Sequence, residues 1–412
     1  MKPFYRVAGI DVHKSMLAVV VGVADQPEKD WERRKFGTTV SELKHLAAWL
    51  QERGVQKVVM ESTAMYWRTV WIALEPHFPL ELAQAQSNRA PHGRKTDFGD
   101  TVRLVRRLWA GELRLSYVPD VEQRRWRMLC QAMQQVQEER TRVRNQIEVL
   151  LEEGQIKLSA VVSDLLGASG RLILKALVAG RQTAAEMAEM AFGRLRARSE
   201  ELTAALEGTL DEICRGLLDQ GLKRIEVLDG QQQEQRQWLG KMQREYASVL
   251  RRLGQVPGID VLAGQKILAA VGPTAAAFSS SADLASWVGV CPGRNESAEH
   301  SAGEHCPKGY RPLRGLLAQA AWAAVRTKGS YFQELFRRWV PRMGVKKAIW
   351  AIAHRLVCII WCILHRGDTY VERGALALDE AGRQRKKKRL LQGLRQLGYE
   401  VTLNLIPEGV GG

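Results

Sequence analysis

The pattern of apolar and polar positions changes character along the 412-residue chain, and the first third alternates between strand-like and helix-like segments. Short runs, of which the first two are apolar and rich in valine, predict strands at 6–12, 17–23, near 34–40, 57–61 and 80–85. Helical periodicity predicts helices at 41–51, 66–74 and 96–110. Three strands followed by helix, strand, helix, strand and helix is the element order of an α/β RNase H-like domain. We assign this domain to residues 1–120.

From residue 121 the pattern becomes helical and rich in Gln and Glu. Apolar residues recur with coiled-coil-like spacing at Met133, Val136, Val143, Ile147 and Leu150. A second long helical pattern runs through 200–250, and 156–194 reads as mixed helix and loop. We therefore predict a long helical coiled-coil hairpin with an insertion over 121–250, suited to assembly or to spanning nucleic acid.

Residues 251–368 form a third, mainly α unit, which opens with the segment LGQVPGIDVLAGQKILAAVG. This segment resembles a helix-hairpin-helix, in which backbone N–H groups of a glycine turn bind a phosphate. Asp260 stands where a second glycine is common, so phosphate binding and structural packing both explain it. The remainder, 369–412, is a basic tail whose stretch RQRKKKR fits either a solvated tail or non-specific phosphate contact.

The charge balance points to a polyanionic partner. The chain has 61 Lys+Arg against 45 Asp+Glu, a net charge of +16, while an apolar fraction of 45% argues against global disorder. A basic folded chain favours nucleic acid, because each neutralised phosphate releases counterions.

The apolar stretches and the cysteines indicate the cellular compartment. Asp11 interrupts the only apolar run near the start, which argues against a signal peptide. The run 348–364 contains His354 and Arg355, so we expect a buried helix and no membrane span. Six cysteines without a framework spacing indicate reduced thiols. We expect a cytoplasmic protein that faces nucleic acid.

Four carboxylates stand at positions where an RNase H-like sheet brings its elements together: Asp11, Glu61, Asp97 and Asp100. Taken singly, the last two are explained by the helix dipole, worth roughly 0.3–1 kcal/mol each. The first two are explained as strand-end carboxylates. Together they offer the oxygen ligands that Mg²⁺ needs for two-metal phosphodiester cleavage. Arg94 and Lys95 precede the aspartate pair and are candidate phosphate contacts.

The motifs GIDVHK, VVMESTAMYW and NRAPHGRKTDFGDTVRLVRRL resemble, in order and spacing, the DEDD transposases of bacterial insertion sequences. These are RuvC-like recombinases, and the family includes members guided by a bridge RNA. The resemblance implies that the four carboxylates are the catalytic tetrad and bind Mg²⁺ or Mn²⁺.

A second block, WVGVCPGRNESAEHSAGEHCPKGYRPLRG, is similar to the serine-containing C-terminal domain of that family. The resemblance implies that Ser297 attacks a DNA phosphate and forms a covalent phosphoserine. Ala298 departs from the glycine that many members place after the serine, and Ser301 offers a competing hydroxyl. Without the resemblance, Ser297 reads as a polar loop residue.

The residues around this serine suggest two further sites. The resemblance places a basic element at Lys308, Gly309, Leu313 and Arg314. Arg311 lies within it, and Lys308, Arg311 and Arg314 are the candidate nucleic-acid contacts. Zinc would also accept the nearby set Cys291, His300, His305 and Cys306, but its spacing matches no standard finger. A structural reading of these four residues is therefore favoured.

The resemblance implies a site-specific recombinase that mobilises its own insertion sequence. Its partners would be donor and target DNA, a guide RNA and further copies of the chain, as a dimer or tetramer. The nearest alternative is a RuvC-like, structure-specific endonuclease of the Holliday-junction resolvase type that uses the acidic tetrad only. Two others are an ATPase of the actin/sugar-kinase type, suggested by GIDVHKS, and a catalytically inactive nucleic-acid-binding protein.

Overall fold

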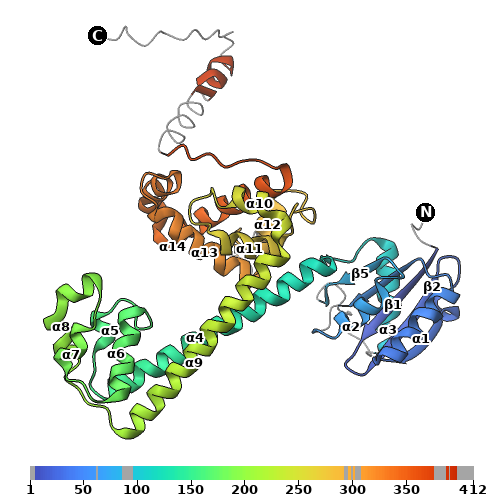
Figure 1. Cartoon of the computed structure of the whole chain (residues 1–412). Helices are drawn as coiled ribbons and strands as arrows, with labels where there is room; N and C mark the ends of the chain where they lie inside the picture. The colour runs from blue at the N-terminus through green and yellow to red at the C-terminus, as the bar shows by residue number, and fades with distance from the viewer. Residues whose placement is uncertain are drawn as a thin grey trace. The chain divides into compact units, whose positions relative to one another are not determined.

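The computed structural model describes residues 5–61, 64–85, 96–291, 296–297, 300–301, 308–374, 387–388 and 390–396. The chain divides into two compact units, Met1–Pro119 and Asp120–Gly412. The first unit contains a mixed β-sheet, and the second is mostly helical (Figure 1).

The sheet of the first unit has six strands in the order β3-β2-β1-β4-β5-β6. A tight hairpin joins β1 to β2, and β3 extends this antiparallel side. On the other side β4 runs parallel to β1, β5 runs parallel to β4, and β6 pairs antiparallel with β5. The strands are β1 (Arg6–Val12), β2 (Met16–Val23), β3 (Glu32–Gly37), β4 (Lys57–Glu61), β5 (Leu80–Ala83) and β6 (Leu115–Ser116).

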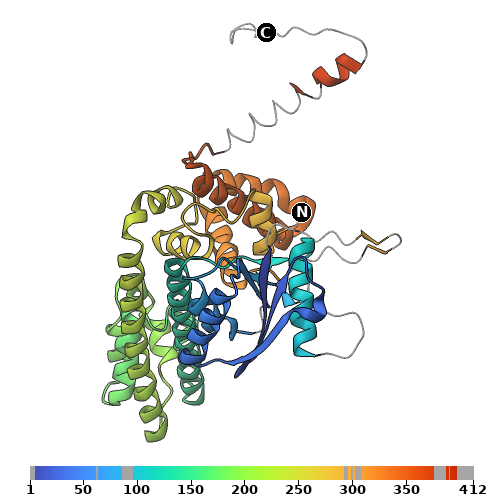
Figure 2. The ribbon, with the colours of Figure 1, turned by 90° about the vertical axis from the view of Figure 1, so that its right-hand side faces the viewer.

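Helices cover both faces of this sheet (Figure 2). On one face α1 (Val40–Glu52) and α2 (Trp67–Leu74) bury leucines and tryptophans against the strands. On the other face α3 (Asp97–Ala110) packs with Leu104 and Val105 against valines of β1, β2 and β4. A short 3₁₀ turn, η1 (Glu28–Asp30), precedes β3. The central strands are buried on both faces, which explains their continuous apolar sequences.

Two long helices of the second unit, α4 (Val121–Glu153) and α9 (Glu212–Met242), pack against each other (Figure 1). Val143 and Ile147 of α4 share one buried cluster with Leu218, Leu222 and Ile225 of α9. A helical group between them completes this cluster. It consists of α5 (Leu158–Val161), α6 (Ala168–Ala179), α7 (Ala184–Glu189), η3 (Gly193–Arg198) and α8 (Ser199–Ala205).

A second buried cluster joins the start of α4, through Trp126, to the helices that follow α9. The two-stranded ribbon β7–β8 lies between α12 and α13 in the chain. The elements are η4 (Arg244–Tyr246), α10 (Ala247–Leu253), α11 (Val261–Val271), α12 (Ser281–Val288), β7 (Glu296–Ser297), β8 (His300–Ser301), α13 (Arg311–Arg326), α14 (Tyr331–Trp361) and the π-helical turn η5 (Cys362–Arg366).

The helix α14 is broken at Gly344, whose φ of 77° and ψ of 163° are not helical. Together with η5 it spans Tyr331–Arg366, which is long and apolar enough to cross a membrane by length and composition. Of its apolar window, 56% is buried inside the protein. The expected buried helix at 348–364 is therefore found as the second half of α14 and the start of η5.

The predicted elements of the first unit correspond closely to the strands and helices found. The two-residue strand β6 was not expected. The helical pattern through 200–250 is not one helix but α8, α9, η4 and α10. The break before α9 has a local cause, because the Asp211 side chain accepts a hydrogen bond from Cys214 N at 2.7 Å and caps a new helix.

Candidate active site

A close approach of α3 to β1 builds the candidate site. A Cβ atom at Gly9 would lie 2.8 Å from Thr101 O and 2.8 Å from Val105 Cγ2, so only glycine leaves room for the helix. The Thr101 hydroxyl lies 2.7 Å from Asp97 O of its own helix and 3.3 Å from Ala18 O of the neighbouring strand, so α3 is close to both β1 and β2. These contacts place the first turn of α3 over the end of β1.

The carboxylates of Asp11 and Asp97 meet at the imidazole of His13. His13 Nε2 lies 3.2 Å from Asp11 Oδ2 and 3.6 Å from Asp97 Oδ1. Asp11 is near the end of β1, His13 is in the β1–β2 turn, and Asp97 is the first residue of α3. Three side chains from separate elements therefore converge on one point.

Glu61 and Asp100 complete the acidic cluster. Burial raises the pKa of Asp11, the nearby His13 opposes this effect, and the charges of Glu61, Asp100 and Asp97 raise the pKa further. The other three predicted carboxylates thus lie close enough to act electrostatically on Asp11. Asp100 is buried, with 7% of its surface exposed.

Two basic side chains partly balance this negative charge. Arg103 Nη2 lies 2.9 Å from Asp100 Oδ1, and Lys35 Nζ lies 3.5 Å from Asp97 Oδ2. The carboxylates are held by these pairs, but four of them in one place still favour a bound cation.

The donor set fits a divalent metal ion. Ligand atoms of Asp11, His13 and Asp97 all lie within 4.8 Å of one another. Two ligands bound side by side at about 2.1 Å from an ion lie about 3 Å apart, close to the separations from His13. His13 was not predicted as part of the site, since only the hairpin turn brings it back over Asp11.

The segment that carries Ser297 runs from Trp287 to Tyr310, and these two residues pack against each other in the second unit. The Trp287 and Tyr310 rings stack with centroids 4.6 Å apart and an interplanar angle of 15°. The Arg127 guanidinium lies 5.7 Å and 5.6 Å from these two ring centroids. Gly309, with a φ of 56°, passes so close to Val288 O that a Cβ atom would lie 2.1 Å from it. The two ends of the segment are therefore held together.

The backbone of Ser297 lies in β7, where it pairs with His300 of β8. The side chains of these two residues lie outside the described part of the structure. Cys291 is half-buried, whereas His305 and Cys306 are outside the described residues, so the zinc hypothesis stays open. The candidate phosphate contacts Arg94 and Lys95 are also outside them. Lys308 and Arg311 are exposed, and Arg314 is partly exposed.

The helix-hairpin-helix-like segment is explained by packing. The Asp260 side chain accepts a hydrogen bond from Ala263 N at 2.7 Å and so occupies the start of α11 with its own carboxylate. Gly258, with a φ of 86°, lies against α13, where a Cβ atom would be 2.2 Å from Ala320 O. Both residues serve the fold, which argues against a phosphate at this turn.

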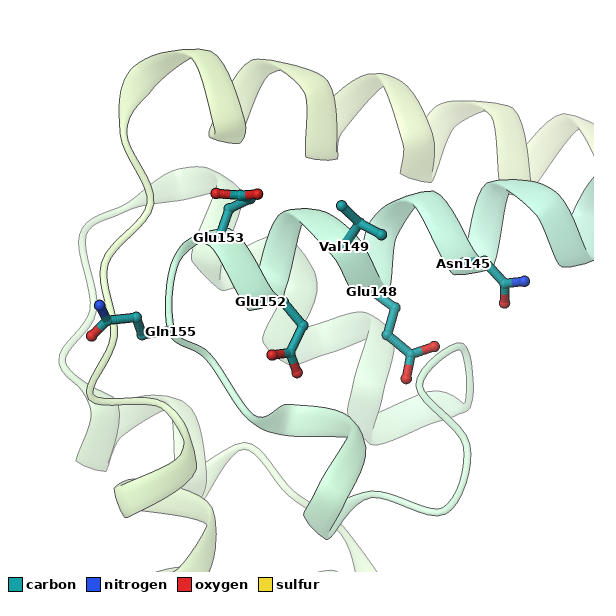
Figure 3. A pocket seen from close by; sticks show the side chains of 6 residues that line it. All are labelled: Asn145, Glu148, Val149, Glu152, Glu153 and Gln155. Atoms are coloured by element: carbon teal, nitrogen blue, oxygen red, sulfur yellow. The ribbon is translucent and has the colours of Figure 1, made fainter.

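A hollow of about 530 Å³ at the end of α4 is a poor site for nucleic acid (Figure 3). Three of its six lining side chains are glutamates: Glu148, Glu152 and Glu153. Their negative charge repels phosphate. The acidic cluster of the first unit is thus the candidate catalytic centre, and the basic positions of the second unit are the candidate contacts to nucleic acid.

Comparison with known families identifies the family of the chain. A sequence model of DEDD transposases of the IS110 type matches residues 8–155, and a model of the transposase IS116/IS110/IS902 family matches residues 250–337. Together the matches cover more than half of the chain. The chain belongs to the DEDD-type transposases of the IS110 family. A search of curated proteins found no match.

The DEDD transposase domain implies an RNase H-like fold, a dependence on divalent metal and action on DNA. The mixed sheet of the first unit, flanked by helices on both faces, agrees with this fold. The DEDD match includes all four carboxylates of the acidic cluster, and the second match includes Ser297.

Proposed function

We propose that this transposase is a recombinase that excises and inserts its own insertion sequence, with the acidic cluster and Ser297 as its two catalytic elements. The observation that carries the proposal is the convergence of Asp11 and Asp97 on His13. In a family that cuts and joins DNA, such a cluster of ligands at the end of the central strand is best explained as the cleavage site.

The first unit would hold Mg²⁺ or Mn²⁺ through Asp11, Glu61, Asp97 and Asp100, with His13 as an additional ligand. When bound, the ion supplies Lewis-acid polarisation of the scissile phosphate. Lys35 and Arg103 keep the carboxylates of α3 oriented toward the cluster, through the ion pairs described above.

Ser297 would act as the nucleophile. Its oxygen forms a bond to the phosphorus as the bond from phosphorus to one deoxyribose oxygen breaks. The serine proton passes to solvent, and the leaving oxygen takes up a proton. Lys308, Arg311 and Arg314 follow in the chain and would stabilise the negative charge on the phosphate during attack.

The partners follow from the reaction and from the charge. Strand exchange needs donor and target DNA, and the net charge of +16 is suited to holding them. We further propose a guide RNA and a homo-oligomer, in which the paired helices α4 and α9 serve as a coiled-coil assembly element. Purifying the protein with its bound nucleic acid and sequencing that material tests the RNA directly. RNA matching sequence beside the gene is expected, and its absence would favour DNA sites read by protein.

The acidic cluster is tested by Asp97→Asn in a strand-exchange assay on DNA carrying the ends of the element. Asp97 is 40% exposed at its side chain, so its removal should leave the fold intact. The variant should lose exchange, whereas Asp25→Asn, at an exposed position in the same unit, should keep it. Exchange by Asp97→Asn at the wild-type rate would overturn the proposal.

A RuvC-like endonuclease that uses the acidic cluster alone is the second candidate. It is supported by the ligand cluster of Asp11, His13 and Asp97, which lies entirely within the first unit. Ser297→Ala separates the two, because a simple nuclease keeps strand cleavage and the recombinase loses it.

A further inference from the structure

One stretch of the helical unit carries a large excess of basic over acidic residues. Between residues 308 and 367 the sequence has twelve Lys and Arg but a single acidic residue, Glu334, which is paired with Arg337 at 2.7 Å. These residues belong largely to α13 and α14, which pack side by side (Figure 1). Their positive charge is therefore largely unbalanced within the two helices.

A ring contact joins the basic residues of the two helices into one surface. The Arg314 guanidinium of α13 lies 4.7 Å from the ring centroid of Trp350 on α14. Lys346 and Lys347 precede Trp350 by four and three residues, so they lie on the same side of α14, one turn away. Lys308, just before α13, is linked to the same surface, because Arg314 Nη1 donates a hydrogen bond to Lys308 O at 3.4 Å. We call Lys308, Arg311, Arg314, Lys346 and Lys347 the α13–α14 basic surface.

The two lysines stand at a position where positive charge does not favour the helix dipole. They follow the break at Gly344 and lie in the first turn of the second half of α14. Positive charge is unfavourable at a helix start, where the macrodipole favours carboxylates. All seven residues from 341 to 347 are exposed, so burial does not explain the lysines either.

Gly315 is an exposed position on this surface, where the backbone of α13 carries no side chain. It lies inside α13, next to Arg314 and one turn after Arg311. Glycine in a helix costs roughly 0.5–1 kcal/mol relative to alanine. A Cβ atom there would meet no described atom within 4 Å, so packing within the chain does not require glycine. A backbone left bare beside two arginines is suited to close contact with a ligand.

We propose that the α13–α14 basic surface binds the phosphate backbone of a DNA duplex, with Gly315 allowing a strand to approach α13 closely. The choice of DNA rests on the proposed function, because Lys308 ends the segment that carries Ser297. The surface thereby extends the basic element expected from the sequence onto a second helix that the sequence did not indicate.

The experiment measures binding of the full chain to a fluorescein-labelled DNA duplex by anisotropy, in EDTA and over a series of salt concentrations. The variant Lys346→Ala/Lys347→Ala is compared with Lys175→Ala/Lys223→Ala. The control removes the same charge from α6 and α9, where both lysines are paired with acids. The surface variant should bind several-fold more weakly, and the slope of log affinity against log salt should become shallower by about one for each lysine.

Three outcomes would overturn the proposal. An unchanged affinity and slope would remove the lysines from the interface, and equal weakening by the control would reduce the effect to net charge. Loss of binding to an RNA hairpin of equal length, with DNA binding intact, would make this an RNA surface. Lys346→Gln/Lys347→Gln, checked by circular dichroism, repeats the test with longer side chains. Because EDTA prevents metal-dependent cleavage, the result does not depend on whether the cleavage proposal holds.

Gly315→Ala gives a sharper test because it changes no charge. It should raise the unfolding temperature and weaken DNA binding several-fold. Gly216→Ala, at an exposed helical glycine of α9 that also has no described atom within 4 Å of a Cβ, should raise the unfolding temperature alone. Wild-type DNA affinity for Gly315→Ala would overturn the proposed close approach.

Discussion

Trp287 and Tyr310 stack face to face, 4.6 Å apart, although 22 residues separate them in the chain. Tyr310 N also donates a hydrogen bond to Trp287 O at 3.1 Å, so both the backbones and the rings of these two residues are in contact. Between them runs the segment that carries Ser297. The base of the proposed nucleophile is thus a rigid part of the helical unit.

Tyr310→Ala should therefore lower strand exchange more than it lowers stability. The lost ring pair is worth roughly 0.5–1.5 kcal/mol beyond its buried area. Misplacing a reacting group by about 1 Å costs on the order of 100-fold in rate. Tyr310→Phe keeps the ring and should keep most of the exchange rate. Single-turnover exchange rates and thermal unfolding, measured on the same variants, check this prediction. An exchange rate for Tyr310→Ala that falls only as much as the fraction of folded protein would contradict it.

Gly9→Ala should destabilise the first unit and disturb the acidic cluster. The added methyl group would press on the backbone of Thr101, and overpacking of this kind costs roughly 1–3 kcal/mol. The free energy of unfolding, measured with denaturant, and the affinity for Mn²⁺ should both fall. Gly230→Ala, at a helical glycine of α9 with open space around it, should be neutral or stabilising. A Gly9→Ala protein with wild-type stability and metal affinity would refute the close approach of α3.

His13→Ala should weaken Mn²⁺ binding to the full chain, by roughly 10–100-fold if the imidazole supports the site. Electron spin echo modulation from a bound ¹⁴N should be present in the wild type and absent in this variant. His45→Ala, an exposed histidine on α1, is the matched control and should change neither result. Tight Mn²⁺ binding without ¹⁴N modulation would exclude His13 as a ligand and leave the carboxylates as the site.

Asp229 should make the stability of the second unit depend on pH. Burial alone would raise its pKa, but hydrogen bonds from Arg140 and Arg171 outweigh burial and lower it. A lowered folded pKa means that the contribution is present above the unfolded value of about 3.9 and is lost as pH falls through the folded value. Asp229→Asn should therefore cost on the order of 1 kcal/mol at pH 7, and the difference from wild type should shrink below about pH 4.

The control for this prediction is Asp219→Asn. Asp219 pairs with Lys223 one turn away on an exposed face of α9, where solvent screening leaves such a pair little effect on stability. Unfolding by urea at several pH values measures both variants. A pH-independent difference for Asp229→Asn would show that its effect is not electrostatic.

The sequence predicts the first unit well because its strands are local and strongly patterned. The buried runs of β1 and β4, and the aspartate pair at the start of α3, need no tertiary information. His13 could not be assigned in this way. Its place between Asp11 and Asp97 depends on the hairpin that turns the chain back and on the seating of α3 against Gly9.

The helical unit was harder to predict for related reasons. The continuous helical pattern of 200–250 conceals the start of α9 at Asp211, because the capping side chain outweighs the periodicity. The break at Gly344 lies just before the helix expected at 348–364, and the first half of α14 was not predicted. The pairing of Arg314 with Trp350 joins residues 36 positions apart and has no local signature.

The most direct measurement is the covalent complex between the protein and DNA that carries the ends of its own insertion sequence. A labelled duplex is incubated with the protein, its copurified nucleic acid and Mg²⁺, and the products are separated under denaturing conditions. We predict a labelled protein–DNA adduct with wild type, and none with Ser297→Ala or with Asp97→Asn. Strand cleavage and an adduct that persist in Ser297→Ala would contradict the account.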